Sequence, residues 1–167
     1  TERWLTSSIL AADSGKALEE LAFTILEAAG YKTVATQVVI DPDYIACKGG
    51  TADWIGMTPN NELIVLDVKR LGLFGYKDMV LKGTRRAKQQ YYTQLQLYMH
   101  ALGIHNAQIM CLSADHSALK GQWRQRGYDM ERLPPPVWME SIPYDETWVS
   151  RSIERAMKIT DYLDMEN

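Results

Sequence analysis

Two acidic residues and a lysine stand where an antiparallel hairpin would bring them together. Two strand-like runs flank a turn-forming segment, Pro59-Asn60-Asn61. With the turn there, Asp53 lies opposite Asp67 within one residue of register, and cross-strand Cβ atoms are about 5 Å apart. Lys69 follows Asp67 by two residues, so it projects from the same strand face. Since two carboxylates at this separation repel, we expect a cation between them.

This set of residue types suits the hydrolysis of phosphodiesters. The reaction needs an activated water and neutralisation of the charge that builds on the phosphate. Mg²⁺ supplies both and prefers oxygen ligands, which the side chains of Asp53 and Asp67 and the backbone carbonyl of Val68 can provide. Lys69 is placed to hold the attacking water or the scissile phosphate. We therefore predict a metal-dependent phosphodiesterase site on the hairpin.

A third carboxylate is expected from an earlier element. Glu19 and Glu20 are the candidates, because both lie on a predicted helix before the hairpin. The alternative is that these glutamates face solvent and that Asp67 and Lys69 form an ordinary surface ion pair, which is a frequent and weak interaction. Against that alternative, apolar residues share the strand face of Asp67, so that face should be at least partly covered.

The rest of the pattern predicts the elements that position these residues. Helices are predicted over residues 2–12, from 13 or 14 to 29, from Thr84 as a cap to Gly103, and over 148–163. Strands are predicted at 32–40, 53–57, 63–69, 107–112 and, as an edge strand, 137–143. Loops are predicted at 71–83 and 113–136, with a turn at Asp41-Pro42-Asp43. This order predicts an α/β fold, a mixed sheet with helices on its faces.

Composition narrows the class of protein. The 167 residues, 46% hydrophobic and 23% charged, predict one soluble domain over residues 1–167. No apolar run approaches the length of a membrane span. The two cysteines, Cys47 and Cys111, are too few for a disulfide scaffold, a zinc cluster or an iron–sulfur cluster, and they fit a reducing cytoplasm.

Positive charge is concentrated in one segment of a chain whose net charge is −3. Residues 69–88 hold seven of the 18 basic residues and one of the 21 acidic ones. Such a block can bind phosphates, or it can be an ordinary solvated surface. A second patch of basic and aromatic residues, Trp123 to Tyr128, can stack bases or fold onto the body. The predicted DNA-binding residues are Arg70, Lys77, Lys82, Arg85, Arg86, Lys88, Arg124 and Arg126.

Four motifs occur in an order that resembles a known superfamily. Asp53 followed by Asp67-Val68-Lys69 looks like the signature of the PD-(D/E)XK nucleases. Gly15-Lys16-Ala17-Leu18-Glu19 resembles the Gly-Lys-x-x-Glu helix of phage lambda-type exonucleases and the related YqaJ recombinase group. Tyr92-Thr93-Gln94-Leu95-Gln96 resembles the helix after their lysine strand, and Gln94-x-x-x-Tyr98 is similar to a motif of RecB-like nucleases. The resemblance covers residues 15 to about 163.

The resemblance implies a restriction-endonuclease-like core and roles for its residues. Glu19, Asp53 and Asp67 would hold one or two Mg²⁺ ions, with Mn²⁺ as a substitute. Lys69 would be the catalytic lysine, and Gln94 would orient it or the phosphate, whereas Tyr98 is expected to pack.

The implied function is a DNA exonuclease of a phage or bacterium, acting in recombination, replication or repair beside a partner such as a single-strand-annealing protein. The alternatives of the same fold are a structure-specific endonuclease or junction resolvase, and an inactive module that binds DNA or serves as a scaffold.

Overall fold

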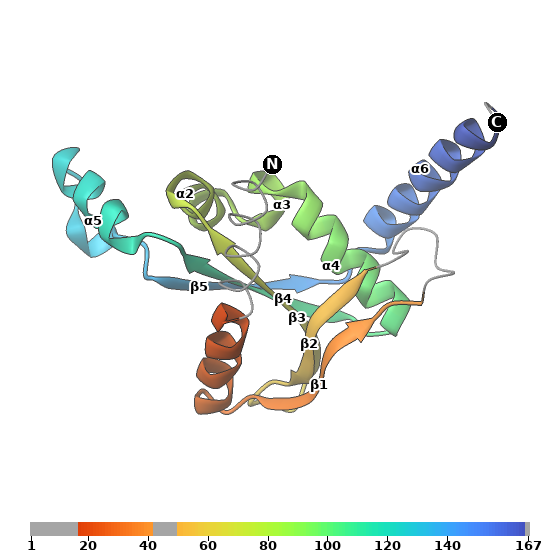
Figure 1. The fold of residues 1–167 in the computed structure, drawn as a ribbon, viewed down its shortest axis with the longest axis horizontal. Helices are drawn as coiled ribbons and strands as arrows, with labels where there is room; N and C mark the ends of the chain where they lie inside the picture. The colour runs from red at the N-terminus through yellow and green to blue at the C-terminus, as the bar shows by residue number, and fades with distance from the viewer. Residues whose placement is uncertain (1–16, 42–49, 166–167) are drawn as a thin grey trace, which may run out of the picture.

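The computed structural model describes residues 17–41 and 50–165 of the chain (Figure 1). The helix that opens the described part covers residues 17–28. The other elements are β1 (Lys32–Val39), β2 (Thr51–Met57), β3 (Leu63–Leu71), α2 (Leu73–Lys82), α3 (Thr84–Ala87), α4 (Gln89–Leu102), β4 (Asn106–Ser113), α5 (His116–Gln125), the 3-10 helix η1 (Met130–Arg132), β5 (Val137–Pro143) and α6 (Glu146–Met165). No helix in these two ranges is both long and apolar enough to cross a membrane.

A five-stranded mixed sheet, in the order β1-β2-β3-β4-β5, forms the centre of the molecule. β3 pairs with β4 in parallel, and the other three pairings are antiparallel. Parallel neighbours need a crossover connection, and the chain makes it through α2, α3 and α4. The strands predicted from the sequence are all present, and β5 is the edge strand expected for residues 137–143. The predicted α/β class is therefore confirmed.

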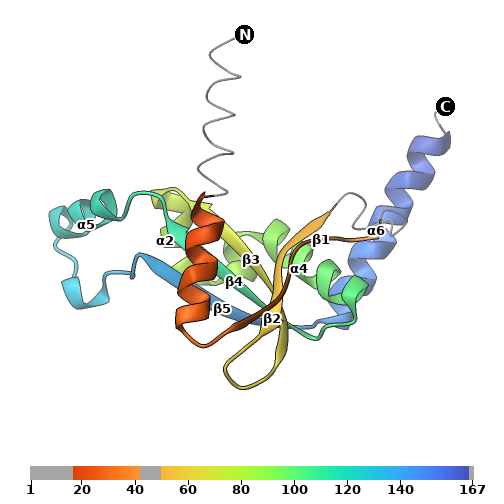
Figure 2. The ribbon, with the colours of Figure 1, turned by 60° about the horizontal axis from the view of Figure 1, so that its bottom comes forward.

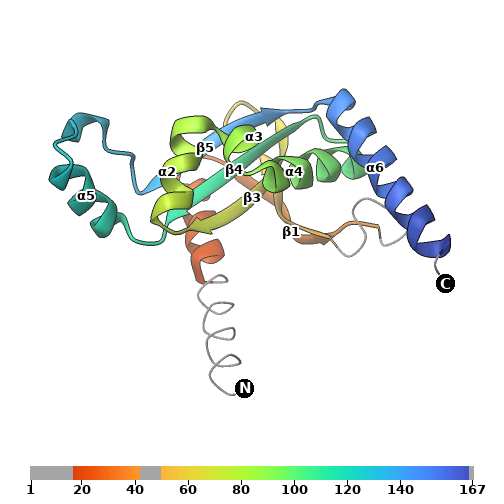
Figure 3. The ribbon, with the colours of Figure 1, turned by 90° about the horizontal axis from the view of Figure 1, so that it is seen from above.

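Successive side chains of β3 enter two different layers. Ile64, Leu66 and Val68 pack with Ala22 and Leu26 of the helix at 17–28 (Figure 2). On the other face lie α2, α3 and α4 (Figure 3). The core on that side combines residues of β3, α2 and α4, among them Val65, Leu71, Tyr76, Met79, Leu95 and Tyr98. Because side chains alternate along a strand, Asp67 and Lys69 lie on the α4 side of the sheet.

The hairpin that carries the acidic residues forms as predicted. The Thr58 N–H donates to the Glu62 carbonyl and the Asn61 N–H donates to the Thr58 carbonyl, both at 2.9 Å. Asn61 adopts φ = +61°, in the left-handed region that asparagine tolerates better than most residues. The paired register runs from Met57–Leu63 to Trp54–Leu66. One step further along this register places Asp53 opposite Asp67.

The loop predicted for residues 71–83 is wrong, because α2 occupies Leu73–Lys82. Tyr76 and Met79 are completely buried, and residues three apart share one helix face. The Tyr76 hydroxyl donates to the Pro135 carbonyl and ties the helix to the segment before β5. Two of the glycines that suggest a loop flank α2 as its cap residues. Tertiary packing therefore supplies the helix that the local pattern lacks.

The single helix predicted from Thr84 to Gly103 is two helices. Lys88, at φ −146° and ψ 73°, separates α3 from α4. Thr84 is not the predicted cap: its N–H and hydroxyl both donate to the Glu140 carboxylate, the former at 2.7 Å. Glu140 lies on β5, which is distant in sequence, so local spacing gives no sign of this contact. At the other end Gly103, with φ +66°, terminates α4 as predicted.

The irregular segment predicted for residues 113–136 also contains a helix. Asp115 caps α5 by accepting a hydrogen bond from the Ala118 N–H at 2.8 Å. Leu119 and Trp123, four residues apart, are buried. The predicted helix at 2–12, the caps at 13 or 14 and most of the turn at 41–43 lie outside the described residues.

Candidate active site

Asp67 is held in β3 almost completely away from solvent. Its side chain is 1% exposed, and that of Lys69 is 20% exposed. Lys69 Nζ lies 2.8 Å from Oδ1 and 2.7 Å from Oδ2 of Asp67, with the hydrogen bond directed to Oδ1. Within the described part of the chain, the buried Oδ2 atom accepts no hydrogen bond. Both carboxylate oxygens therefore face the lysine ammonium, and Oδ2 does so through an ion pair rather than a directed hydrogen bond.

Asp53 continues the contact between β2 and β3 beyond their last paired residues. The paired register ends at Trp54–Leu66. Asp53 Oδ2 then accepts a hydrogen bond from the Val68 N–H at 3.0 Å. The carboxylate takes the position of a strand acceptor and is fixed against β3, next to Asp67. The hairpin therefore brings the two carboxylates together on neighbouring strands.

The charges of the pair are set by burial. Burial raises the pKa of Asp67 to about 6; the Lys69 ammonium opposes this shift and the Asp53 carboxylate adds to it. Burial lowers the pKa of Lys69, but the charge and hydrogen bond of Asp67, together with the charges of Asp53 and Tyr91, more than offset this, so that pKa is raised. A carboxylate whose pKa is raised by burial and by a second carboxylate lacks sufficient positive charge around it. This is the electrostatic setting in which an additional cation binds favourably.

Helix α4 supplies a second layer over the pair. Lys69 Nζ lies 5.3 Å from the centroid of the Tyr91 ring, within the range of a cation–π contact. Gln94 Nε2 donates to the Tyr98 hydroxyl at 2.7 Å. Burial raises the pKa of Tyr98, the hydrogen bond from Gln94 lowers it, and the Asp67 charge raises it again. The Tyr98 hydroxyl is therefore within electrostatic reach of the carboxylate.

The sequence predicted Gln94 as an orienting residue for Lys69 or the phosphate, and Tyr98 as packing. In the structure the two form one hydrogen-bonded unit. The contact of Tyr91 with Lys69 is not among the sequence-based predictions. The signal that could have found it is spacing, since positions 91, 94 and 98 share one helix face.

Glu19 approaches from the other layer of the molecule. Its Oε2 atom accepts a hydrogen bond from Gln37 Nε2 at 3.3 Å. Gln37 lies on β1 between residues paired with Trp54 and Ala52, so it stands opposite Asp53, and its φ is +52°. Glu19 is thus one strand away from Asp53. Among the described side chains, no group of three or more His, Cys, Asp or Glu is arranged to hold a metal ion.

The predicted DNA-binding residues are distributed over several elements. Arg85 is the most engaged: it lies 3.5 Å from Asp145, with its guanidinium 5.4 Å from the Tyr92 ring centroid and 4.8 Å from that of Trp148. Lys82 pairs with Asp78 on α2 at 3.0 Å. The exposed members of the set are Arg70, Lys82, Arg85, Arg86, Arg124 and Arg126, while Lys77 and Lys88 are half-buried.

The basic block and the aromatic patch, separated in sequence, meet in space. Lys77 Nζ lies 5.8 Å from the ring centroid of Trp123 and 5.6 Å from that of Tyr128. Trp123 is buried, and its indole N–H donates to the Asp129 carbonyl at 2.8 Å. Trp123 packs against the body of the protein, which is one of the two alternatives for this patch, whereas Tyr128 stays exposed.

No known protein family model matches the chain, and no curated protein matches it by sequence. Its backbone is similar to the crystal structure of an alkaline exonuclease, LHK-Exo, from Laribacter hongkongensis, with a TM-score of 0.53 and 17% identity. The match covers 87% of this chain and 67% of that one. The structure of LHK-Exo in complex with dAMP matches over the same shares of both chains, with a TM-score of 0.51 and 19% identity.

At this level of identity the likeness establishes the fold. The nuclease-type fold expected from the four motifs is therefore confirmed, and the chain spans about two thirds of the length of the exonuclease that it resembles.

Proposed function

We propose, from a fold shared with an alkaline exonuclease, that this chain is a metal-dependent nuclease that hydrolyses phosphodiester bonds of DNA. The observation that carries the proposal is the buried Asp67–Lys69 pair beside Asp53 on the central hairpin. An ordinary surface ion pair would be exposed and would not bring a second carboxylate with it. Here Asp53 and Asp67 are held next to each other by the pairing of β2 with β3 and by the contact of Asp53 with the Val68 N–H.

Asp53, Asp67 and the Val68 carbonyl are the proposed ligands of Mg²⁺, with Mn²⁺ as a substitute. The residues present fit such an ion, because carboxylates from two neighbouring strands lie together and both burial and the Asp53 charge raise the pKa of Asp67. Glu19, whose carboxylate is engaged with Gln37, would contribute through a bound water. When bound, the metal supplies activation of water and neutralisation of charge on the phosphate.

Lys69 is the proposed catalytic lysine. Its ammonium carries three donors, of which one is directed to Asp67 Oδ1. The remaining donors can hold the scissile phosphate or the attacking water. Tyr91 and the Gln94–Tyr98 unit limit where the lysine can move, so we propose that they position Lys69 rather than react.

The proposed substrate is DNA and the proposed mode of action is removal of nucleotides from an end. The support for this mode is that LHK-Exo, which shares the fold, is named as an exonuclease. The exposed basic residues of α3 and α5 would contact the phosphate backbone. We further propose a role in the DNA recombination, replication or repair of a bacterium or phage, in the cytoplasm and beside a partner such as a single-strand-annealing protein.

The test compares linear, nicked and closed circular DNA in Mg²⁺, in Mn²⁺ and in EDTA. We expect end-labelled linear DNA to be shortened only when a metal is present, and the closed circle to stay intact. Asp67→Ala and Lys69→Ala should abolish the reaction, and Lys158→Gln, on the exposed face of α6, should leave it unchanged.

Three results would contradict parts of the proposal. Cleavage of the closed circle would replace the exonuclease by an endonuclease or resolvase of the same fold. DNA binding without cleavage in either metal would indicate an inactive binding module. Full activity of either alanine variant would overturn the assignment of the site.

A further inference from the structure

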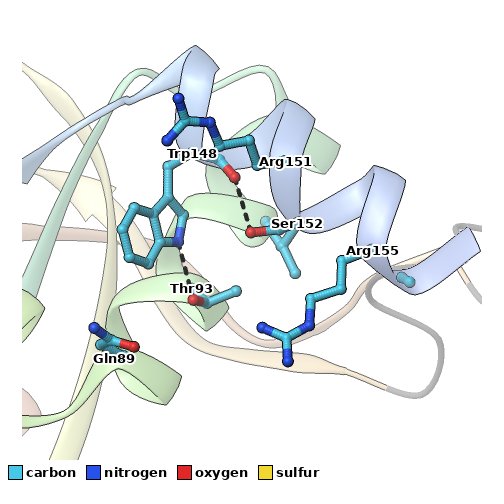
Figure 4. Close-up of a pocket in the computed structure, with 8 residues that line it drawn as sticks. Gln89, Thr93, Trp148, Arg151, Ser152 and Arg155 are labelled. Atoms are coloured by element: carbon cyan, nitrogen blue, oxygen red, sulfur yellow. Dashed lines mark hydrogen bonds between the residues drawn. The ribbon is translucent and has the colours of Figure 1, made fainter. Parts of the chain in front are cut away.

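A cavity of about 460 Å³ lies between α4 and α6, apart from the residues of the candidate active site (Figure 4). Its volume falls in the range of about 300–1,000 Å³ that small-molecule sites occupy. The cavity is lined from α4 by Gln89, Thr93 and Leu97, and from α6 by Trp148, Arg151, Ser152, Arg155 and Ala156. Its two charged residues are both arginines, and none of the lining residues is acidic.

The two arginines keep their positive charge available. Within the described part of the chain, no carboxylate forms an ion pair with Arg151 or Arg155, and both residues are exposed. The neighbouring Arg85 differs, because it pairs with Asp145 and lies over two aromatic rings. Two guanidinium groups without a countercharge, on a chain of net charge −3, form a local positive site that attracts anions.

Hydrogen bonds between α4 and α6 and within α6 hold the walls of the cavity in place. The Trp148 indole N–H donates to Thr93 Oγ1 at 3.0 Å, and the Ser152 hydroxyl donates to the Trp148 carbonyl at 2.8 Å (Figure 4). Tyr92 packs edge-on against Trp148 with ring centroids 5.1 Å apart. Fixed walls spare a ligand the free-energy cost of ordering the cavity when it binds.

Helix α4 places this cavity next to the candidate active site. Positions 89, 93 and 97 follow one stripe of the helix and line the cavity. Positions 91, 94 and 98 follow the adjacent stripe and carry the contacts near Lys69 and Asp67. A ligand in the cavity would therefore lie against the same helix that covers the carboxylates.

We propose that the cavity between α4 and α6 binds phosphate groups through Arg151 and Arg155, either from a nucleic-acid strand or from a free mononucleotide. Guanidinium groups suit this ligand because they offer paired donors that match phosphate oxygens. Residues i and i+4 share one helix face, and the two guanidinium groups lie on opposite sides of Ser152 (Figure 4), so each side chain would hold a separate phosphate. Gln89, from the opposite helix, adds an amide donor. Neither arginine is among the residues proposed to act in cleavage.

The test measures binding in EDTA, so that cleavage plays no part in it. One arm titrates inorganic phosphate and dAMP by calorimetry. The other follows the anisotropy of a labelled single strand of about 12 nucleotides, without terminal phosphates, at several salt concentrations. Each arm compares wild type with R151Q/R155Q and with K32Q/R132Q, which removes the same charge from exposed positions outside α4 and α6.

We expect R151Q/R155Q to weaken binding about tenfold or more and to reduce the salt dependence of strand binding by about 1 to 2 in slope. K32Q/R132Q should change the affinity by less than about twofold, since its charges lie on elements that do not line the cavity. The lysine variant R151K/R155K should fall between, because it keeps the charge and loses the paired donors. Thermal unfolding of each variant checks that the fold is retained.

A loss confined to phosphate and dAMP would identify a free mononucleotide as the ligand, and a loss confined to the strand would identify the backbone of a nucleic acid. Equal binding by wild type and R151Q/R155Q in both arms would overturn the proposal, as would an equal loss in K32Q/R132Q. Because no arm requires turnover, a chain that binds but does not cleave would contradict the nuclease proposal and leave this one standing.

Discussion

Two ion pairs of this protein have similar contact distances, but the pKa of the acidic residue is raised in one pair and lowered in the other. Asp67 and Lys69 on β3 are 2.8 Å apart, and Glu154 and Lys158 on α6 are 2.6 Å apart. The side chains of the β3 pair are 1% and 20% exposed, and those of the α6 pair are 64% and 72% exposed. The pKa of Asp67 is raised by burial, whereas the pKa of Glu154 is lowered by the hydrogen bond and charge of Lys158.

The difference shows that contact distance alone does not define a functional pair. On α6 water solvates both charges, and the lysine merely favours the ionised acid. On β3 the free-energy cost of desolvating the carboxylate exceeds the stabilisation by the lysine charge, so the carboxylate remains short of positive charge. We infer that the buried pair is suited to a metal ion and that the exposed pair is a surface contact. Four predictions test this contrast, beginning with the largest effect.

The first compares Asp67→Asn with Glu154→Gln, two changes that remove a charge with little change in shape. Asp67→Asn should reduce metal-dependent DNA cleavage by about a thousandfold or more, equivalent to about 4 kcal/mol in the barrier, because a metal ligand is lost. Glu154→Gln should cleave like wild type. Initial rates on end-labelled linear DNA give the comparison, and similar losses in both variants would remove the functional contrast between the pairs.

The second compares Lys69→Met with Lys158→Met in stability. Lys69→Met leaves a buried carboxylate without its partner, so we expect the free energy of unfolding at pH 8 to fall by about 3–5 kcal/mol. Lys158→Met should leave the urea midpoint unchanged within error. Adding Asp67→Asn to Lys69→Met should recover much of the loss, since the uncompensated charge is then gone. A double variant as unstable as Lys69→Met would instead point to lost packing of the lysine stem.

The third concerns pH in the absence of metal. The pKa of Asp67 is about 6 in the folded chain and 3.8 for an unperturbed aspartate. Between these values the folded state binds more protons than the unfolded state, so the free energy of unfolding falls as pH rises. This difference in pKa lowers the free energy of unfolding by about 3 kcal/mol in total, and the loss is complete above pH 6.

Urea denaturation from pH 4 to pH 8 in EDTA measures this dependence. The free energy of unfolding of Asp67→Asn should vary less with pH across that range than that of wild type. Glu154→Gln should run parallel to wild type above pH 4.5, because the pKa of Glu154 is lowered from 4.5 and its titration is confined to more acidic conditions. Parallel curves for wild type and Asp67→Asn would show that Asp67 is not desolvated as the structure indicates.

The fourth and smallest effect concerns the Tyr91 ring, 5.3 Å from Lys69 Nζ. Tyr91→Leu removes the ring and should lower stability by about 0.5–1 kcal/mol beyond the loss of packing. Tyr91→Phe keeps the ring and serves as the control. A double-mutant cycle measures the contribution of the ring. It is the difference between the stability loss caused by Tyr91→Leu in wild type and the loss that the same change causes in Lys69→Met. A coupling energy of zero would mean that the ring only packs.

Much of the candidate site could be read from the chain because its determinants are local. The alternation of β3, the turn at residues 58–62 and the two-residue spacing of Asp67 and Lys69 follow from strand geometry. The same reasoning places Asp53 opposite Asp67, and the hairpin confirms it. The roles of these residues in catalysis and metal binding stay predictions.

The parts that local patterns missed depend on contacts between distant segments. Helix α2 is stabilised by burial of Tyr76 and by its bond to Pro135, and α3 begins where Thr84 meets Glu140. Local patterns gave the opposite signal in both cases, a loop in the first and one continuous helix in the second. The cavity between α4 and α6 has the same origin, since its two walls are more than 40 residues apart in sequence.

The amino-acid sequence by itself determined which residues share a strand face, where the hairpin turns and where basic charge is concentrated, because each depends on the period of a strand or on neighbours along the chain. Only the tertiary structure decided that Asp67 is desolvated, that Lys69 lies beside the Tyr91 ring and that Arg151 and Arg155 line a cavity. The physical reason is that desolvation and side-chain partnership are properties of packed surfaces. They arise only when a sheet and its helices, formed from separate segments, exclude water between them.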